Sequence, residues 1–310
     1  MSKSRLLVSI FGLLVVLAGV AAAEHPASIS YDNVFALRVN PLGVGDDFRA
    51  RYRVGLYPSP RPLLASNFFG VVVPLLAAPS FVRPGIGVEL QPLSVLQLYV
   101  GYEPTLTFGA VGALHSYRSP DADVGFGPVQ LGGPPSMPGD LYRTVVHQLV
   151  LGATVQAAWR WLGFRSSWRA QLVDAQLRNG DTVFYDQLYG LLLPRSGWML
   201  HGETAAVYRS SFGLTAGLQY ILTATWYPAS AYAAGEPHTN PNTPIQKLGP
   251  VVAYTFARER RGRFEAPTLS LLVAWYLEDR YRAGQLVSQA IPMVGVAFSF
   301  RGTLWSTVRP

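Results

Sequence analysis

A strict two-residue alternation of apolar and polar side chains is the feature that most limits what this chain can fold into. In the segment 48–56, every even position is apolar or aromatic and every odd position is arginine or glycine. Successive side chains of a β-strand point to opposite faces, whereas a helix would spread these arginines around its circumference. The segment is therefore predicted to be a strand with one apolar face and one face that carries Arg49, Arg51 and Arg53.

The same alternation recurs along most of the chain. Segments 86–91 and 96–102 alternate on either side of a short turn at 92–94, which predicts a hairpin. With the weaker segment 66–76, which contains Pro74 and so lacks one ladder donor, the count is about twelve strands. The remaining predicted strands lie near 30–39, 149–157, 164–172, 198–208, 212–226, 248–258, 267–279 and 290–301.

The start of the chain indicates export. Lys3 and Arg5 precede a nearly continuous apolar stretch from residue 6 to residue 20, and three alanines follow. This pattern predicts a secretory signal peptide at residues 1–23, cleaved before Glu24. A retained membrane anchor is the alternative, but about 15 apolar residues are few for a hydrocarbon core of about 30 Å.

The composition after that segment favours strands that face lipid. Hydrophobic residues make up 49% of the chain and charged residues only 14%, against about 25% charged residues in ordinary globular domains. The sequence after residue 23 nevertheless contains no apolar run of about 18 residues, so it predicts no spanning helix. The chain also has no cysteine, which excludes disulfides and thiolate metal sites. Closure of a sheet on itself would leave no unpaired edge.

We therefore predict an all-β fold, a closed antiparallel transmembrane β-barrel of about twelve strands. An even strand number places both ends of the barrel on the periplasmic side. The short turns at 92–94, 161–163, 208–211 and 259–266 then face the periplasm. Three long loops, at 104–140, 179–197 and around 235–241, are expected to point outward into the extracellular space.

The last predicted strand resembles the terminal signal of bacterial outer-membrane β-barrel proteins. That signal has a glycine, a hydrophobic or aromatic residue three positions later, and an aromatic residue two beyond, and Gly295, Phe298 and Phe300 match it. The resemblance implies recognition by the barrel-assembly machinery and insertion into outer-membrane lipid. Family members typically end at the aromatic residue, whereas this chain continues with Arg301–Pro310. We expect residues 24–301 to form the barrel and 302–310 a short C-terminal extension; an ordinary amphipathic strand is the alternative.

Alternation also predicts which side chains face the barrel interior. A charged side chain that faces the bilayer midplane costs about 2–4 kcal/mol, which favours the inward orientation. The expected lumen residues are Arg49, Arg51, Arg53, Glu89, Gln91, Gln97, Gln148, Gln156, Arg165, Arg169, Gln171, His201, Glu203 and Gln219. Arg49, Arg51 and Arg53 would lie about 7 Å apart on one face. With Glu89 as the nearest plausible carboxylate, one or more of these arginines is expected to lack a protein partner.

The sequence gives little sign of catalysis. His201 and Glu203 would share one face of a strand and could form an acid–base pair, although a hydrogen-bonded pair lining the barrel is the alternative. His147 has no serine two residues later, so the histidine–serine spacing of outer-membrane lipases is absent. Asp121 and Asp123 are a weak calcium signal. No catalytic site, metal site or cofactor is predicted.

Three functions follow in order of preference. The net charge of +7 comes mainly from scattered arginines, so we expect no nucleic-acid partner and consider small anionic solutes instead. A narrow porin-like channel for anions or small polar solutes is the leading hypothesis. A closed barrel that acts as a structural or interaction platform is the alternative. An outer-membrane lipid-modifying enzyme is third.

Overall fold

The structure is a computed structural model that describes residues 26–108, 114–121, 142–240, 242, 244–256, 263–280, 288 and 290–307. The predicted signal peptide, the end of the C-terminal extension and much of the first long loop lie outside these residues. No helix in the part of the chain described is long and apolar enough to cross a membrane. One short 3-10 helix, η1, spans Ala229–Ala231.

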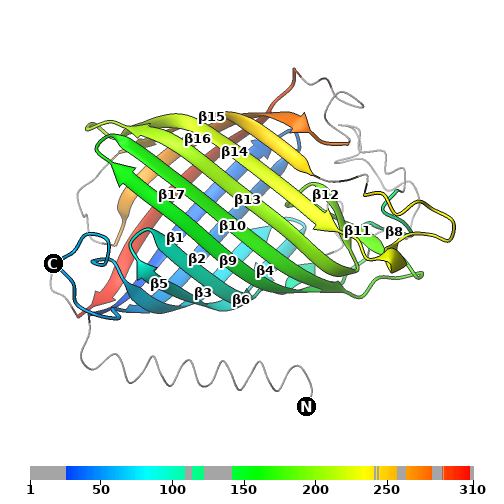
Figure 1. The fold of residues 1–310 in the computed structure, drawn as a ribbon, viewed down its shortest axis with the longest axis horizontal. Coiled ribbons are helices and arrows are strands. Elements are labelled where there is room, and N and C mark those ends of the chain that lie inside the picture. The colour runs from blue at the N-terminus through cyan, green and yellow to red at the C-terminus, as the bar shows by residue number, and fades with distance from the viewer. Residues whose placement is uncertain are drawn as a thin grey trace, which may run out of the picture.

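The described chain forms a closed antiparallel barrel with a wall of twelve strands (Figure 1). Closure is provided by β1, which pairs with β2 on one side and with β17 on the other. The fold class predicted from the alternation is confirmed. The wall consists of β1 Ala27–Val39, β2 Gly43–Val54, β3 Phe68–Ala78, β4 Phe81–Pro84 with β5 Ile86–Leu93, β6 Leu96–Tyr102 with β7 Thr105–Thr107, β9 Val145–Trp159, β10 Leu162–Ala175, β13 Ser196–Arg209, β14 Leu214–Trp226, β15 Ile245–Thr255, β16 Glu265–Glu278 and β17 Met293–Ser306.

Two wall strands are interrupted, and one interruption lies beside Pro74. Strands β4 and β5 both pair with β3 and are separated by Gly85. The Gly85 N–H donates to the Pro74 carbonyl at 2.8 Å. A proline has no N–H to donate to a neighbouring strand. At Pro74, β3 therefore only accepts a hydrogen bond, and the partner strand is divided into β4 and β5 at this point. The predicted strand near 66–76, which was the weakest of the strand predictions, is therefore present as β3.

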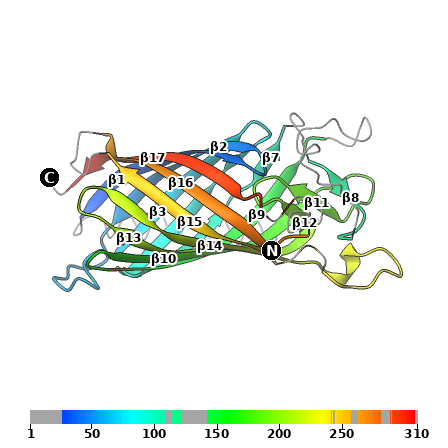
Figure 2. The same cartoon turned by 90° about the horizontal axis from the view of Figure 1, so that it is seen from above.

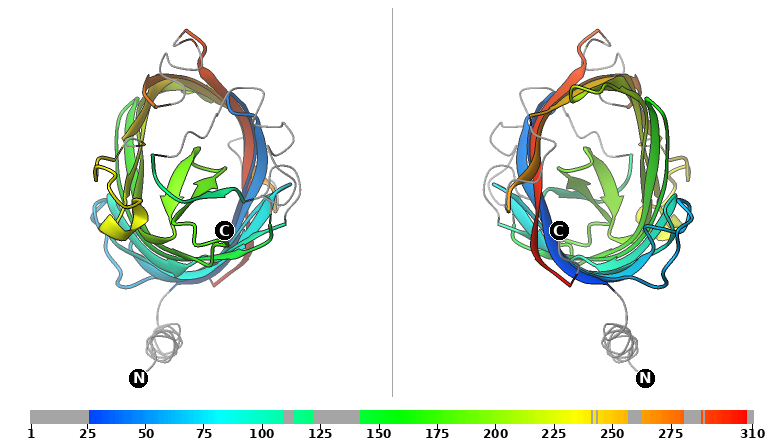
Figure 3. Two further views of the ribbon diagram at one scale, coloured as in Figure 1. Left: turned by 90° about the vertical axis from the view of Figure 1, so that its right-hand side faces the viewer. Right: turned by 90° about the vertical axis from the view of Figure 1, so that its left-hand side faces the viewer.

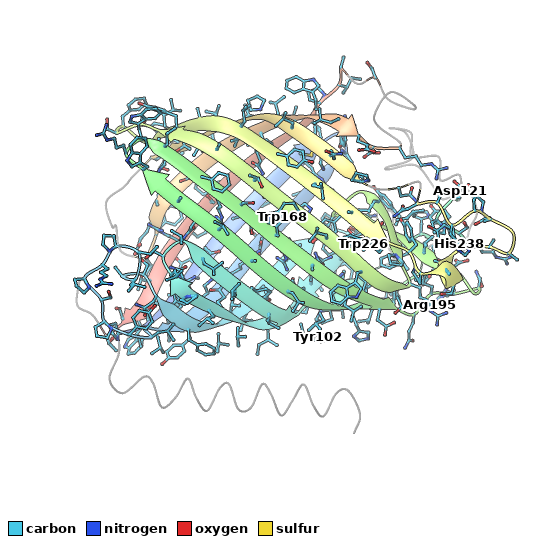
Figure 4. The ribbon with its side chains drawn as sticks, viewed as in Figure 1. Tyr102, Asp121, Trp168, Arg195, Trp226 and His238 are labelled. Atoms are coloured by element: carbon cyan, nitrogen blue, oxygen red, sulfur yellow. The ribbon has the colours of Figure 1, made fainter. Side chains whose placement is uncertain are left out.

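Both ends of the barrel wall lie at one end of the molecule, here called the terminal end. The opposite end, called the loop end, carries the long connections (Figures 1 and 2). Every second wall residue points away from the interior, and many of these outward side chains are large and apolar. Examples of exposed outer side chains are Phe35, Leu98, Leu151, Leu218 and Leu269. Figure 4 shows side chains projecting from the wall over its length.

The loop that follows β10 folds into the barrel instead of pointing outward. It contains β11, Val183–Asp186, and β12, Leu191–Pro194, which pair with each other. Strand β8, Ser116–Tyr117, pairs with β11 and completes a three-stranded sheet. We call this sheet the plug. Figure 3, a view along the barrel, shows the β11–β12 hairpin inside the ring of wall strands. The prediction of an outward loop at 179–197 is therefore wrong.

The plug folds inward because its side chains are apolar on both faces. Phe184, Leu191, Leu192 and Leu193 are each at most 1% exposed. Phe184, Leu191 and Leu193 belong to a core cluster with wall residues such as Met199, and Leu192 belongs to a second cluster. Burial of each such side chain contributes about 1.5–3 kcal/mol. Four of them together stabilise the inward position by roughly 6–12 kcal/mol, so the body of the plug is a fixed part of the fold.

The last strand is longer than the sequence indicated. Strand β17 continues to Ser306, and Ser306 pairs with Ser28 of β1. The Thr307 N–H then donates to the Ala27 carbonyl at 2.9 Å. Most of the segment expected to be an extension, 302–310, is thus the end of the barrel's final strand. The expected boundary at residue 301 is wrong because the pairing with β1 extends as far as β1 does.

Candidate pore lumen

The residues predicted to line the lumen all lie on the inner face of the wall. Each alternates with outer apolar side chains on its own strand: Arg49 and Gln97, for example, each lie next to an exposed residue, Phe48 and Leu98. Residues that are paired across neighbouring strands lie on the same face, so the inner face extends from strand to strand. Arg51 lies opposite Val72 of β3, and Val72 is 2% exposed.

The three arginines of β2 all have carboxylate partners. The Arg49 guanidinium binds Asp47, two residues earlier on the same face, with 2.7 Å between Nη2 and Oδ2. Arg51 forms ion pairs with Asp32 of β1 and with Glu89 of β5. Glu89 also accepts from Arg53 at 3.1 Å. The expectation that one or more of these arginines lacks a protein partner is therefore wrong. Asp32 and Asp47 supply the carboxylates that the sequence analysis missed.

A second charged cluster joins β6 to β10. Arg169 Nη2 donates to both carboxylate oxygens of Glu103 at 2.7 Å. The Tyr99 hydroxyl donates to the same carboxylate at 2.8 Å. Glu103 is 5% exposed, and a buried carboxylate needs such partners to offset its loss of hydration. The cluster therefore fixes the position of the Arg169 side chain within the lumen.

His201 and Glu203 contact each other, as their spacing allows. His201 Nε2 lies 3.3 Å from Glu203 Oε1, and His201 Nδ1 lies 2.9 Å from the Thr223 hydroxyl. Gln219 Nε2 donates to the other oxygen of Glu203 at 3.4 Å. The imidazole ring also packs against Tyr189 of the plug, with 4.9 Å between ring centroids. This arrangement ties the plug to the wall strands β13 and β14.

The plug tip, residues 186–190, is anchored to the wall on several sides. Asp186 faces Arg83 of β4, with 3.7 Å between Oδ2 and Nη2. The Tyr189 hydroxyl accepts from Gln171 of β10 at 2.5 Å. The side chain of Gln187 accepts from the Ser80 hydroxyl. Strands β4 and β10, which are three positions apart in the wall, therefore hold one short loop inside the lumen at the loop end.

The plug covers two of the predicted lumen residues. Gln148 is 1% exposed and Gln171 is 0% exposed, so both face inward but lie beneath the plug. Near the terminal end, Gln156 donates to the Ser94 carbonyl at 3.1 Å and Gln91 to the Ser66 carbonyl at 2.5 Å. Arg165, by contrast, is exposed in the lumen, and no ion pair involves it among the residues described.

The inner faces of β1 and β2 are accessible to solvent along their whole length. Every inner-face residue of these two strands is at least partly exposed, from the terminal end to the loop end, although the Arg51 side chain is only 11% exposed. The opposite wall is different, because Val146, Val173 and Met199 are at most 1% exposed beneath the plug. We call the accessible surface the β1–β2 track. It comprises Ser28, Ser30, Asp32, Val34, Ala36 and Arg38 of β1 and Gly43, Gly45, Asp47, Arg49, Arg51 and Arg53 of β2.

The sequence of β1 also alternates, and this pattern could have identified the inner-face residues Asp32 and Arg38. On β1, polar or small residues occupy the even positions 28–38 except Val34, and larger side chains occupy most odd positions from 29 to 39. The same alternation that identified Arg49 on β2 would therefore have placed Asp32 and Arg38 on the inner face. Asp186 gave no such signal, because its position depends on the inward fold of the plug.

The residues of the terminal assembly signal are divided between the two faces of β17. Gly295 lies on the inner face, opposite Arg38. Phe298 and Phe300 lie on the outer face and form an aromatic group with Phe264, whose ring centroid is 4.6 Å from that of Phe300. Tyr31 of β1 packs edge-on against Phe300 at 6.3 Å. The group covers the outside of the closing seam between β1 and β17.

The described residues contain no group of three or more histidine, aspartate or glutamate side chains placed to hold a metal ion. Asp121 forms an ion pair with Arg280 at 3.0 Å, and Asp123 lies outside the described residues. In Figure 4, Asp121 lies at the loop end with Arg195 and His238.

Comparison with known proteins identifies no family. No family model matches the sequence, and a search of curated proteins finds no match. Among solved structures, the KdgM porin shares 10% identity over 87% of this chain and 98% of that chain, with a TM-score of 0.39. The NanC porin shares 10% identity over 89% of this chain and 100% of that chain, also with a TM-score of 0.39. The Pseudomonas putida toluene transporter TodX shares 11% identity, covers 90% of this chain and 89% of that chain, and has a TM-score of 0.35.

Proposed function

We propose that this chain is a narrow channel of the bacterial outer membrane that conducts small solutes and prefers anions. The β1–β2 track is the observation that carries this proposal. A barrel filled by its plug would bury the inner face of every wall strand at the loop end. Here the inner face of β1 stays half-exposed up to Arg38, which provides a path beside the plug.

The charges along the track support a preference for anions. Among the described residues along the track and beside it, Arg38, Arg49, Arg51 and Arg53 outnumber Asp32, Asp47 and Glu89 by one. Arg49, Arg51 and Arg53 pair with these carboxylates, whereas Arg38 binds the plug. Arg165 adds a positive charge on the opposite wall, where Glu203 of the neighbouring strand β13 carries a negative charge. Rings or rows of arginine bias a pore toward anions because they stabilise an anion that has lost part of its hydration.

Membrane location is the first testable consequence. The outer face exposes large apolar side chains on all sides, and closed barrels satisfy every backbone hydrogen bond within the wall. Fractionated cells should therefore contain the protein in the outer membrane, beginning near Glu24. It should migrate faster in unheated than in heated denaturing gels. Recovery as a soluble periplasmic protein would contradict the proposal.

Conductance with an arginine-dependent selectivity is the second consequence. The double variant Arg51→Gln, Arg53→Gln leaves Glu89 without its two partners. The lumen then loses two positive charges and gains an unpaired carboxylate, so anion preference should fall and the pore should favour cations. The measurement is the zero-current potential of single channels in a potassium chloride gradient. Arg178→Gln is the matched control because Arg178 is exposed outside the barrel wall.

A sealed barrel is the second candidate, and the plug is the observation that favours it. A sealed barrel would serve as a platform, and the arginine substitutions would then alter stability without any current. Correctly folded protein that gives no conductance in planar bilayers would remove the channel and leave the platform.

A further inference from the structure

Arg38 occupies the point where the β1–β2 track passes the plug. It is the last inner-face residue of β1 before the turn to β2, and it is half-exposed. Its guanidinium reaches across to the plug tip. Nη1 donates to the Leu188 carbonyl at 2.8 Å, and Nη2 donates to the Gln187 carbonyl at 2.5 Å. A solute that follows the track must therefore pass this side chain.

Gly43 provides the space in which Arg38 lies. The two residues are paired across β1 and β2. A Cβ atom at position 43 would lie 2.9 Å from Arg38 Nε and 3.3 Å from Arg38 Cγ. Gly43 has no positive φ, so its backbone does not require glycine. The missing side chain instead lets the Arg38 side chain lie against β2.

The two carbonyls that Arg38 binds are held in place from behind. Asp186 Oδ1 accepts from the backbone N–H groups of Leu188 and Tyr189 at 2.9 and 3.0 Å. The Gln187 side chain is held by the Ser80 hydroxyl. The plug tip thus presents two fixed, neutral acceptors to one planar guanidinium. A carboxylate offers the same pair of acceptor atoms with a full negative charge, and charge-assisted pairs of this kind are stronger than neutral ones.

We propose that Arg38 is the specificity-determining residue of the pore and binds the carboxylate group of a passing organic anion. The carboxylate replaces the Gln187 and Leu188 carbonyls as the acceptor for the two guanidinium N–H groups. When the solute leaves, the Arg38 guanidinium again donates its hydrogen bonds to the two carbonyls. This inference rests on the proposed channel function. It adds a binding site and selects carboxylates over anions such as chloride, which lack two oxygen atoms in one plane.

The test measures block of chloride current by acetate in planar bilayers that contain the full-length folded protein. Arg38→Lys keeps the charge but loses the planar pair of donors. Loss of one charge-assisted hydrogen bond should raise the half-blocking acetate concentration about tenfold. Gly43→Ala should have a similar effect, because the new Cβ displaces Arg38 while every charge remains. Val44→Ala is the matched control, because Val44 is the next residue of β2 and its side chain is exposed on the outer face, away from the track.

The outcomes separate this inference from the proposed function. A silent wild-type protein with heat-modifiable migration would overturn the channel itself. A conducting wild-type protein whose acetate block is unchanged in both Arg38→Lys and Gly43→Ala would overturn only the role of Arg38. Weakened block in either folded variant, with normal block in Val44→Ala, would support the carboxylate site.

Discussion

Replacing the plug hairpin with a short link is expected to raise the single-channel conductance severalfold. The change removes Thr182–Pro194 and joins the ends with two glycines. Such a link is feasible because the Arg195 N–H donates to the Thr182 carbonyl at 2.7 Å, so the two ends of the hairpin already lie together. The deletion takes away β11 and β12, which fill the loop end of the lumen.

The expected increase follows from the size of the barrel. Small barrels of about eight strands are filled by their own side chains, whereas barrels of 16–18 strands leave an aqueous channel. A twelve-stranded wall lies between these limits, so its conductance depends on what occupies the lumen. The deletion would expose Val146, Val173 and Met199 to water at a cost of about 1.5–3 kcal/mol for each large side chain. The wall pairing is untouched, so the barrel should persist.

Three controls make the result interpretable. Heat-modifiable migration shows that the deletion variant still forms a barrel. Tyr232→Ala changes an aromatic contact with His238 in the loop between β14 and β15 and should leave the conductance as it is in wild type. The deletion should also weaken the acetate block attributed to Arg38, since a wider lumen lets chloride pass at a distance from this side chain. Unchanged conductance in the deletion variant would show that the hairpin does not obstruct the pore.

Sequence alternation predicted the wall because lipid and lumen impose opposite requirements on the two faces of each strand. The inner-face arginines of β2 are an example, since their outer neighbours Phe48 and Tyr52 must meet the apolar surroundings. The same rule was less informative on β1, where Ser28, Ser30 and Ala36 are small and the contrast with the outer face is weaker.

The plug could not be predicted by alternation because it obeys another rule. Val183–Tyr185 and Leu191–Leu193 are continuous apolar runs that are buried on both faces. In an outward loop such runs would be exposed to water, so their presence within a predicted loop was itself a sign of burial.

The ion pairs of the lumen were only partly predictable. Glu89 could be named from its strand, but the Arg83–Asp186 pair exists only because the hairpin enters the barrel.

Strand β17 shows how closure changes the expected effect of a truncation. The resemblance to the terminal assembly signal predicted that residues 302–310 form an extension beyond the barrel. In the structure, residues from Arg301 to Ser306 pair with the first half of β1, from Asp32 back to Ser28. The β1–β17 seam is therefore closed partly by the segment that seemed to be an extension.

Deleting residues 301–310 is accordingly expected to remove most of the folded barrel from the outer membrane. The deletion leaves the beginning of β1 without a partner on one side, and unpaired backbone groups at membrane depth each cost several kcal/mol. The amount of heat-modifiable protein in the outer-membrane fraction measures the effect. Phe300→Ala should reduce it less, because this change loses the aromatic contact with Phe264 but keeps every backbone pair.

Deletion of residues 308–310 alone is the matched control for this truncation. It leaves the whole of β17 and the hydrogen bonds of Thr307 to Ala27 in place, so assembly should be as in wild type. If the longer deletion also assembled as in wild type, the seam between β1 and β17 would not need its terminal half. The assembly signal Gly295, Phe298 and Phe300 would then suffice for insertion. Loss of assembly in the longer deletion alone would show that the barrel closes through pairing beyond that signal.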